Sequence, residues 1–124
     1  CSYTDPSTSQ MTFKQYWPTG TVASDAVGYV VDDPDVLFMM QADAAVPQTA
    51  LGINAPLAAV QSTSTGSTTT GNSTSALDAT VAVTTGVAFR IVDFVDSPTS
   101  TVGDAYTDVI VKFNNHSYYN PVGI

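Results

Sequence analysis

The sequence contains no glutamate, and all 11 of its acidic residues are aspartate. Glutamate is a good helix former, whereas aspartate favours turns, caps and local hydrogen bonds to the backbone. Valine, threonine, tyrosine and phenylalanine are abundant, and these residues suit strands. The composition therefore favours β-structure over helices.

Basic residues are almost as scarce. The chain has only Lys14, Arg90 and Lys112, against a formal net charge of −8. Proteins that bind nucleic acids need many Lys and Arg contacts to phosphate groups, and anionic membranes attract polybasic segments. We therefore expect no nucleic-acid partner and no membrane partner.

Cysteine and long apolar runs are also rare. Cys1 is the only cysteine and cannot form an internal disulfide. The longest apolar runs, such as 36–40, are far shorter than the roughly 20 residues of a spanning helix, and no basic–apolar–small leader is visible. Because the sequence starts at Cys1 rather than Met, we expect a processed chain or a fragment of a longer one.

The remaining pattern predicts one all-β domain over 1–124. The chain is 44% hydrophobic and 11% charged, a balance typical of folded proteins. Short alternating segments separated by turn signals indicate a small antiparallel barrel or sandwich of about six or seven strands. The expected strands are 11–17, 26–31, 36–42, 79–85, 87–95 and 105–113, with a turn of helix and a short strand within 47–59.

Two of these strands are expected to form a hairpin. Asp32-Asp33-Pro34-Asp35 provides a turn between 26–31 and 36–42. The uninterrupted apolar run at 36–40 suggests burial on both faces of the second strand. Segments 1–10 and 97–103 are expected to be loops.

Two segments are expected to lie outside the sheets. Residues 61–75 are a low-complexity Ser/Thr/Gly stretch without an apolar anchor. Such a stretch cannot offset the roughly 1–2 kcal/mol per residue that backbone ordering costs, so we expect a flexible, exposed loop. Residues 118–124 follow the last strand and are expected to form an extended tail.

No catalytic residue or cofactor is predicted. His116 is the only histidine, and no catalytic or nucleotide-binding motif surrounds it. A catalytic triad or a typical zinc site would need further partners, so a polar residue at the end of a strand is the better interpretation. Asp93 and Asp96 could form a carboxylate pair, but acids beside Ser97-Pro98 are ordinary turn residues.

One cluster raises the question of a metal. Asp32, Asp33 and Asp35 supply the carboxylates that calcium prefers. Pro34 interrupts the cluster, and the spacing is not that of an EF-hand. A solvated turn is favoured, so no metal site is predicted, with calcium as the open alternative.

The aromatic residues give the candidate interface. Trp17, next to Tyr16 and Pro18, is either a core anchor, which is favoured, or part of an exposed patch. The tail either packs back on its own domain or reaches a neighbouring subunit. The interface hypothesis comprises Trp17, Tyr118, Tyr119, Pro121 and Val122.

Three segments carry a resemblance to a known family. They are FKQYWPTGTVASDAVGYVVDDPDVLFMMQAD (13–43), LGINA (51–55) and AFRIVDFVDSPTSTVGDAYTDVIVKFNNHSY (88–118). These residues resemble a group of virion structural proteins of tailed phages, most of all head decoration (cement) proteins. The resemblance covers most of the chain except the Ser/Thr-rich loop.

The resemblance implies a structural function without enzymatic activity. A decoration protein binds the outer surface of the capsid, contacts the major capsid protein and bridges capsomers, commonly as a trimer; a dimer remains an alternative. Family members usually have a further N-terminal stretch, so the resemblance also implies that this chain is the ordered or processed C-terminal part of a longer one. No family site residues can be carried over. The alternatives are a tail or head-fibre component of the virion, and a non-enzymatic adhesion module that binds glycans or calcium.

Overall fold

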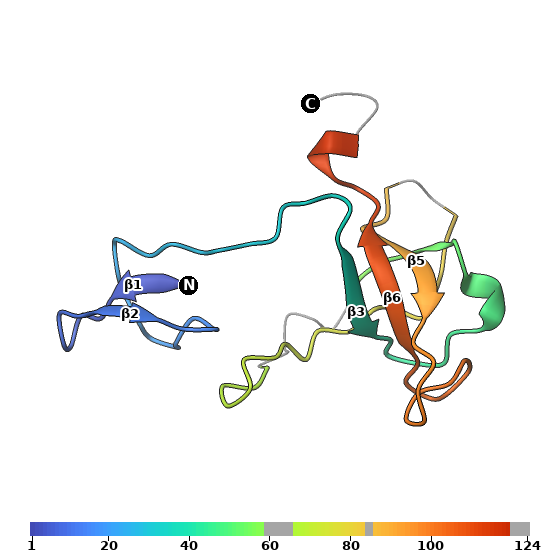
Figure 1. Cartoon of the computed structure of the whole chain (residues 1–124), viewed down its shortest axis with the longest axis horizontal. Coiled ribbons are helices and arrows are strands. Elements are labelled where there is room, and N and C mark those ends of the chain that lie inside the picture. The colour runs from blue at the N-terminus through green and yellow to red at the C-terminus, as the bar shows by residue number, and fades with distance from the viewer. Residues whose placement is uncertain (59–65, 84–85, 120–124) are drawn as a thin grey trace. The chain divides into compact units, whose positions relative to one another are not determined.

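The computed structural model describes residues 1–58, 66–83 and 86–119 (Figure 1). The chain divides into two compact units. The first comprises Cys1–Asp32 and Gly66–Ser73, and the second comprises Asp33–Thr65 and Thr74–Ile124. Both are built on antiparallel strands, which confirms the all-β class.

The first unit is organised by a two-stranded sheet. Strand β1 (Ser2–Thr4) pairs with β2 (Met11–Phe13) in antiparallel register. A third segment joins β1 at Val27, where the backbones of Ser2 and Val27 exchange two hydrogen bonds of 2.9 and 2.8 Å. Two-stranded sheets are marginal in isolation, so this added pairing supports the unit.

Side chains tie the first unit together around β1. The buried ring of Tyr3 packs against Trp17 with 5.1 Å between ring centroids. The Asp25 carboxylate accepts hydrogen bonds from the backbone N–H of Thr4, at 3.1 Å, and from its hydroxyl. These bonds stabilise the charged form and lower the pKa of Asp25, the hydroxyl of Thr4 having the largest effect.

The second unit is built on a four-stranded antiparallel sheet in the order β3-β6-β5-β4. The strands are β3 (Leu37–Gln41), β4 (Asn54–Ala55), β5 (Phe89–Phe94) and β6 (Asp108–Phe113). Strands β3, β6 and β5 lie side by side in Figure 1. A 3-10 helix, η1 (Gln48–Ala50), precedes β4, as the sequence predicts for 47–59.

The core of the second unit lies on one face of this sheet. Successive strand residues point to opposite faces, and one set is apolar and fully buried: Ile91, Val109 and Val111. Leu77 lies outside the strands yet is also 0% exposed, because its backbone pairs with Gln41 and Asp43 at the end of β3. The rings of Phe38, Phe89 and Phe113 complete the core.

The predicted hairpin is wrong. Of 26–31, only Val27 pairs, and it pairs with β1, while Tyr29, Val30 and Val31 are exposed. Strand β3 is confirmed, but its partner is the distant β6. Burial on both faces at 36–40 is also wrong, because the side chains alternate between exposed and half-buried. The continuous apolar run therefore belongs to a strand with one solvent-exposed face.

Other boundaries shift. The 1–10 segment contains β1, which was expected to be loop, and 11–17 is a strand only over Met11–Phe13. Of segment 79–85, the structure describes 79–83, and within this range only Ala82 pairs, in a bridge to Asn54. Strands 87–95 and 105–113 are confirmed as β5 and β6, with later starts. The described strands show no closed barrel, so the barrel or sandwich stays a prediction.

The loop and tail are described only in part. Of the expected loop 61–75, residues 66–73 belong to the first unit, where Ser67 and Asn72 bond through their backbones at 2.8 Å. Residues 59–65 lie outside the described residues. Of the expected tail, Tyr118 and Tyr119 form a 3-10 helix, η3 (Ser117–Tyr119), rather than extended chain. The single domain and the flexible loop stay predictions.

Replacement of Leu77 by alanine tests the position of the core. We expect Leu77→Ala to lower the free energy of unfolding by about 2–5 kcal/mol, because it leaves a cavity in a fully buried site. Leu37→Ala is the matched control, since Leu37 is 53% exposed and its loss should cost less than about 1 kcal/mol. Chemical denaturation of both variants checks this, and equal losses would contradict the assignment.

Acid should weaken the first unit through Asp25. The folded-state pKa is lowered, so the stabilisation is present above the ordinary aspartate pKa and is lost as the pH falls through the lowered value. Carboxyl NMR during an acid titration measures this pKa directly. Thr4→Val removes the main donor and should move the pKa of Asp25 back up; an unchanged pKa would show that the Thr4 hydroxyl is not its cause.

Candidate functional site

The face of the four-stranded sheet opposite the core carries one row of aligned residues. Leu37 of β3 pairs with Lys112 of β6, Lys112 pairs with Arg90 of β5, and Arg90 pairs with Asn54 of β4. Partners in register lie on the same face of a sheet. The row therefore places an apolar residue, two cations and an amide side by side across all four strands.

Leu37, at one end of this row, also belongs to an exposed apolar patch. It consists of Leu37, Met39, Val92 and Ile110, which we call the outer patch. Leu37 is 53% exposed, Met39 is 73% exposed and Val92 is 40% exposed. A shift in register between Ile91 and Asp93 makes Val92 an extra residue on β5. Apolar side chains grouped in this way are typical of surfaces that contact other proteins.

Strand β3 also leaves part of its backbone unpaired. The N–H of Ala42 donates to Thr107 on the β6 side, whereas the carbonyl of Gln41 accepts from Leu77 on the other side. Because backbone groups alternate along a strand, Leu37 and Met39 face the same side as Gln41. Within the part of the chain that the structure describes, their N–H and C=O groups on that side have no partner. This edge can accept another strand.

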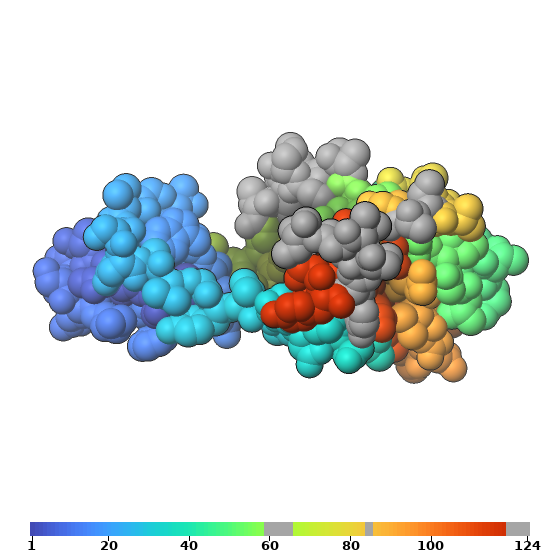
Figure 2. Space-filling model, turned by 90° about the horizontal axis from the view of Figure 1, so that it is seen from above, coloured from blue at the N-terminus to red at the C-terminus, as the bar shows by residue number. Residues whose placement is uncertain are grey.

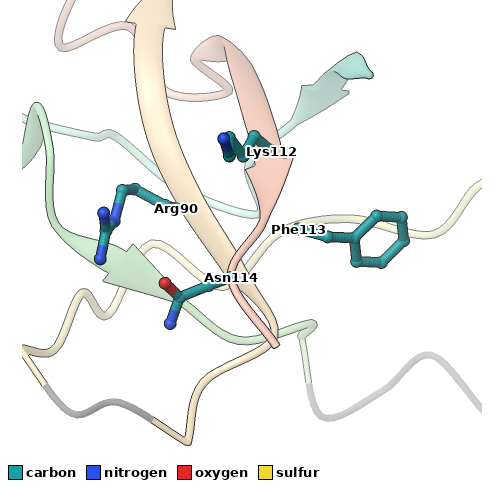
Figure 3. Close-up of a pocket in the computed structure, with 4 residues that line it drawn as sticks. All are labelled: Arg90, Lys112, Phe113 and Asn114. Atoms are coloured by element: carbon teal, nitrogen blue, oxygen red, sulfur yellow. The ribbon is translucent and has the colours of Figure 1, made fainter. Parts of the chain in front are cut away.

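A pocket opens beside the two cations of the row. Arg90, Lys112, Phe113 and Asn114 line a volume of about 260 Å³. In Figure 3, the polar side chains of Arg90 and Asn114 lie on the same side of the strands, and the Phe113 ring points away from them. The ring direction agrees with its packing against Phe38 and Phe89 in the core.

Each cation of the pocket lies beside a polar or charged neighbour. Arg90 donates from Nε to Oδ1 of Asn54 at 3.1 Å. The Lys112 ammonium lies 3.7 Å from the Asp35 carboxylate, and both side chains are solvent-accessible, so this ion pair adds little stability. The pocket therefore brings together two of the three basic residues of a chain of net charge −8.

The predicted interface residues fall in different places. Trp17 belongs to the first unit and is 44% exposed, so it is neither fully core nor fully surface. Tyr118 and Tyr119 both belong to η3 of the second unit, which lies in the red part of the chain in Figure 2. Tyr118 is 72% exposed, and its ring lies 5.0 Å from that of His116. Pro121 and Val122 lie outside the described residues.

The aspartate cluster and the histidine have local structural roles. Asp33 accepts a hydrogen bond of 2.9 Å from the backbone N–H of Asp35, which closes the turn. Nδ1 of His116 accepts one of 3.1 Å from the N–H of Tyr118. Among the described residues, no three His, Cys, Asp or Glu side chains are grouped so that they could hold a metal ion.

The sequence did not lead to a prediction of the basic pocket. Arg90 and Lys112 lie in two segments whose residues alternate as in a strand. Because they are two of only three basic residues, their positions in these strands were the available signal for a basic site. What the sequence does not contain is the register that places Arg90 directly opposite Lys112. That register depends on long-range pairing with a bulge.

Comparisons with known protein families, with curated protein sequences and with solved structures find no match to this chain. In the described ranges, no helix has the length and apolar character needed to cross a membrane. The resemblance to phage decoration proteins therefore stays a prediction from the sequence. The function must be argued from the surface itself.

Hydrogen exchange tests the open edge of β3. The amides of Phe38 and Met40 face β6 and should be protected, whereas those of Leu37 and Met39 face the open side and should exchange at least about tenfold faster. Residue-resolved exchange by NMR on the isolated chain gives this pattern. Equal protection of all four amides would mean that the edge is already covered.

Proposed function

We propose that this protein is a head decoration protein of a tailed phage, which binds the outer surface of the capsid and bridges capsomers. The observation that carries the proposal is the combination of the outer patch with the open edge of β3. Both are features of a surface that binds protein, and both include Leu37 and Met39 of β3.

The chemistry of β3 suits such a contact. Leu37–Gln41 contains no charged residue in a chain of net charge −8, so a partner can approach this strand without a like charge in the strand itself. Leu37 and Met39 offer apolar area, and their free backbone groups offer hydrogen bonds to an added strand. We propose the major capsid protein as the occupant of this edge.

The sequence resemblance supports the choice of a virion over other assemblies. It spans 13–43, 51–55 and 88–118 and therefore includes β3, β5 and β6. Many weak contacts repeated by symmetry can stiffen a shell even when each is weak. Self-association as a trimer, or else as a dimer, belongs to the same proposal, and no enzymatic step is part of it.

The tail or head-fibre alternative predicts a different distribution on the particle. A decoration protein is present in many copies that follow the symmetry of the shell, whereas a fibre or tail component is confined to a few positions. Electron cryomicroscopy of the intact particle distinguishes the two.

A charge placed on β3 should weaken attachment to the shell. We expect Met39→Lys to weaken binding to expanded capsids that lack this protein by at least about tenfold, because it places a charge in an apolar contact. The measurement is cosedimentation of the full chain with such capsids over a range of concentrations.

Val83→Lys is the matched control. Val83 is 86% exposed and follows Ala82, which bridges β4 at the opposite edge of the sheet. This variant should bind like the original protein. If both variants bind normally, β3 is not the contact. If the isolated chain is a dimer with protected Leu37 and Met39 amides, a second copy covers the edge and the capsid assignment of β3 is wrong.

A further inference from the structure

The basic pocket has features of a binding site that the proposed function does not use. The chain has 11 aspartates and three basic residues, yet two of the three basic residues pair directly across β5 and β6. Like charges placed opposite each other destabilise a sheet. Such an arrangement is favourable when an anion binds between the two cations.

The two cations of the pocket differ in their neighbours. Asp35 lies 3.7 Å from Lys112, while the side-chain hydrogen bond of Arg90 goes to the neutral amide of Asn54. Among the described residues, the guanidinium of Arg90 therefore has no carboxylate within the distance of an ion pair.

Asn54 fixes the direction of the guanidinium. It is only 5% exposed, and it accepts the Nε–H of Arg90 at 3.1 Å. This bond occupies Nε and leaves the two terminal nitrogens for a ligand. A planar guanidinium held in this way can donate two parallel hydrogen bonds to one carboxylate or phosphate group.

The pocket has room for such a group. Its volume of about 260 Å³ is several times the roughly 30 Å³ that one water occupies. It is smaller than the typical site of a drug-sized ligand, about 300–1,000 Å³. The size therefore suits a single oxyanion or the end of one acidic side chain better than a large cofactor.

We propose that the pocket lined by Arg90, Lys112, Phe113 and Asn114 binds an oxyanion, either a carboxylate or a phosphate group. Arg90 donates two hydrogen bonds to the anion, and Lys112 adds a second positive charge beside it. The source is either a free phosphate ion or an acidic side chain of a protein partner. The site does not depend on a role in the virion.

Arg90 provides a direct readout, because it is the only arginine in the sequence. Its Nε–H gives one side-chain signal in a ¹⁵N-correlated NMR spectrum of the full chain. We expect this signal to shift and saturate at low ionic strength when inorganic phosphate is added, or when an acetylated Asp-containing peptide is added. Saturation by phosphate supports a free ion as the ligand, and saturation by the peptide alone supports an acidic side chain.

Variants separate a built site from general attraction of anions. Arg90→Gln should weaken binding, followed through the backbone signals of 112–114, by at least about tenfold. Arg90→Lys keeps the charge but loses the planar pair of donors. It should therefore also weaken binding, by about threefold or more.

Lys14→Gln is the matched control. Lys14 is exposed and is not one of the four residues that line the pocket. The variant removes the same charge and should change the affinity by less than about twofold, since general attraction between exposed charges is screened by salt. The proposal is overturned if neither probe saturates, if Arg90→Lys binds as tightly as the original chain, or if Lys14→Gln weakens binding as much as Arg90→Gln.

Discussion

The pairing of β5 with β6 determines both faces of the second unit. Its register sets Ile91 against Val111 on the core side and Arg90 against Lys112 on the other. Because side chains alternate along a strand, a slip of one residue would exchange these faces. It would bury a charged row and expose the apolar core, so the hydrophobic core and the basic pocket depend on the same set of backbone hydrogen bonds.

The first unit depends on a different balance. Its two strands of three residues each bury little, and Met11 and Phe13 on β2 are exposed by 66% and 70%. The backbone pairing of Ser2 with Val27 and the bonds from Thr4 to Asp25 compensate for part of this. A carboxylate fixed by a neighbouring threonine thus has a structural role here, which suits a chain whose only acid is aspartate.

The sequence predicts some elements well and others poorly, for physical reasons. Strands β5 and β6 alternate clearly, and the 3-10 turn before β4 follows from Pro47 and Gly52, so all three were predicted. The partner of β3 could not be predicted, because a strand of five residues pairs equally well in many registers until the core selects one. Leu77 gave no periodic signal, since its burial comes from two isolated bridges. Of the interface hypothesis, exposure of Tyr118 agrees with a surface role, whereas the pairing of Arg90 with Lys112 needed three-dimensional register.

The position of Leu77 has a consequence for any strand that joins β3. Leu77 already occupies the backbone groups of Gln41 and Asp43 on that side, so the exposed template is limited to Leu37 and Met39. Two residues offer about four backbone groups for hydrogen bonds. This is fewer than the roughly six-residue segments that form fibrils offer. Leu77 therefore limits the length over which an added strand could pair with this edge of β3.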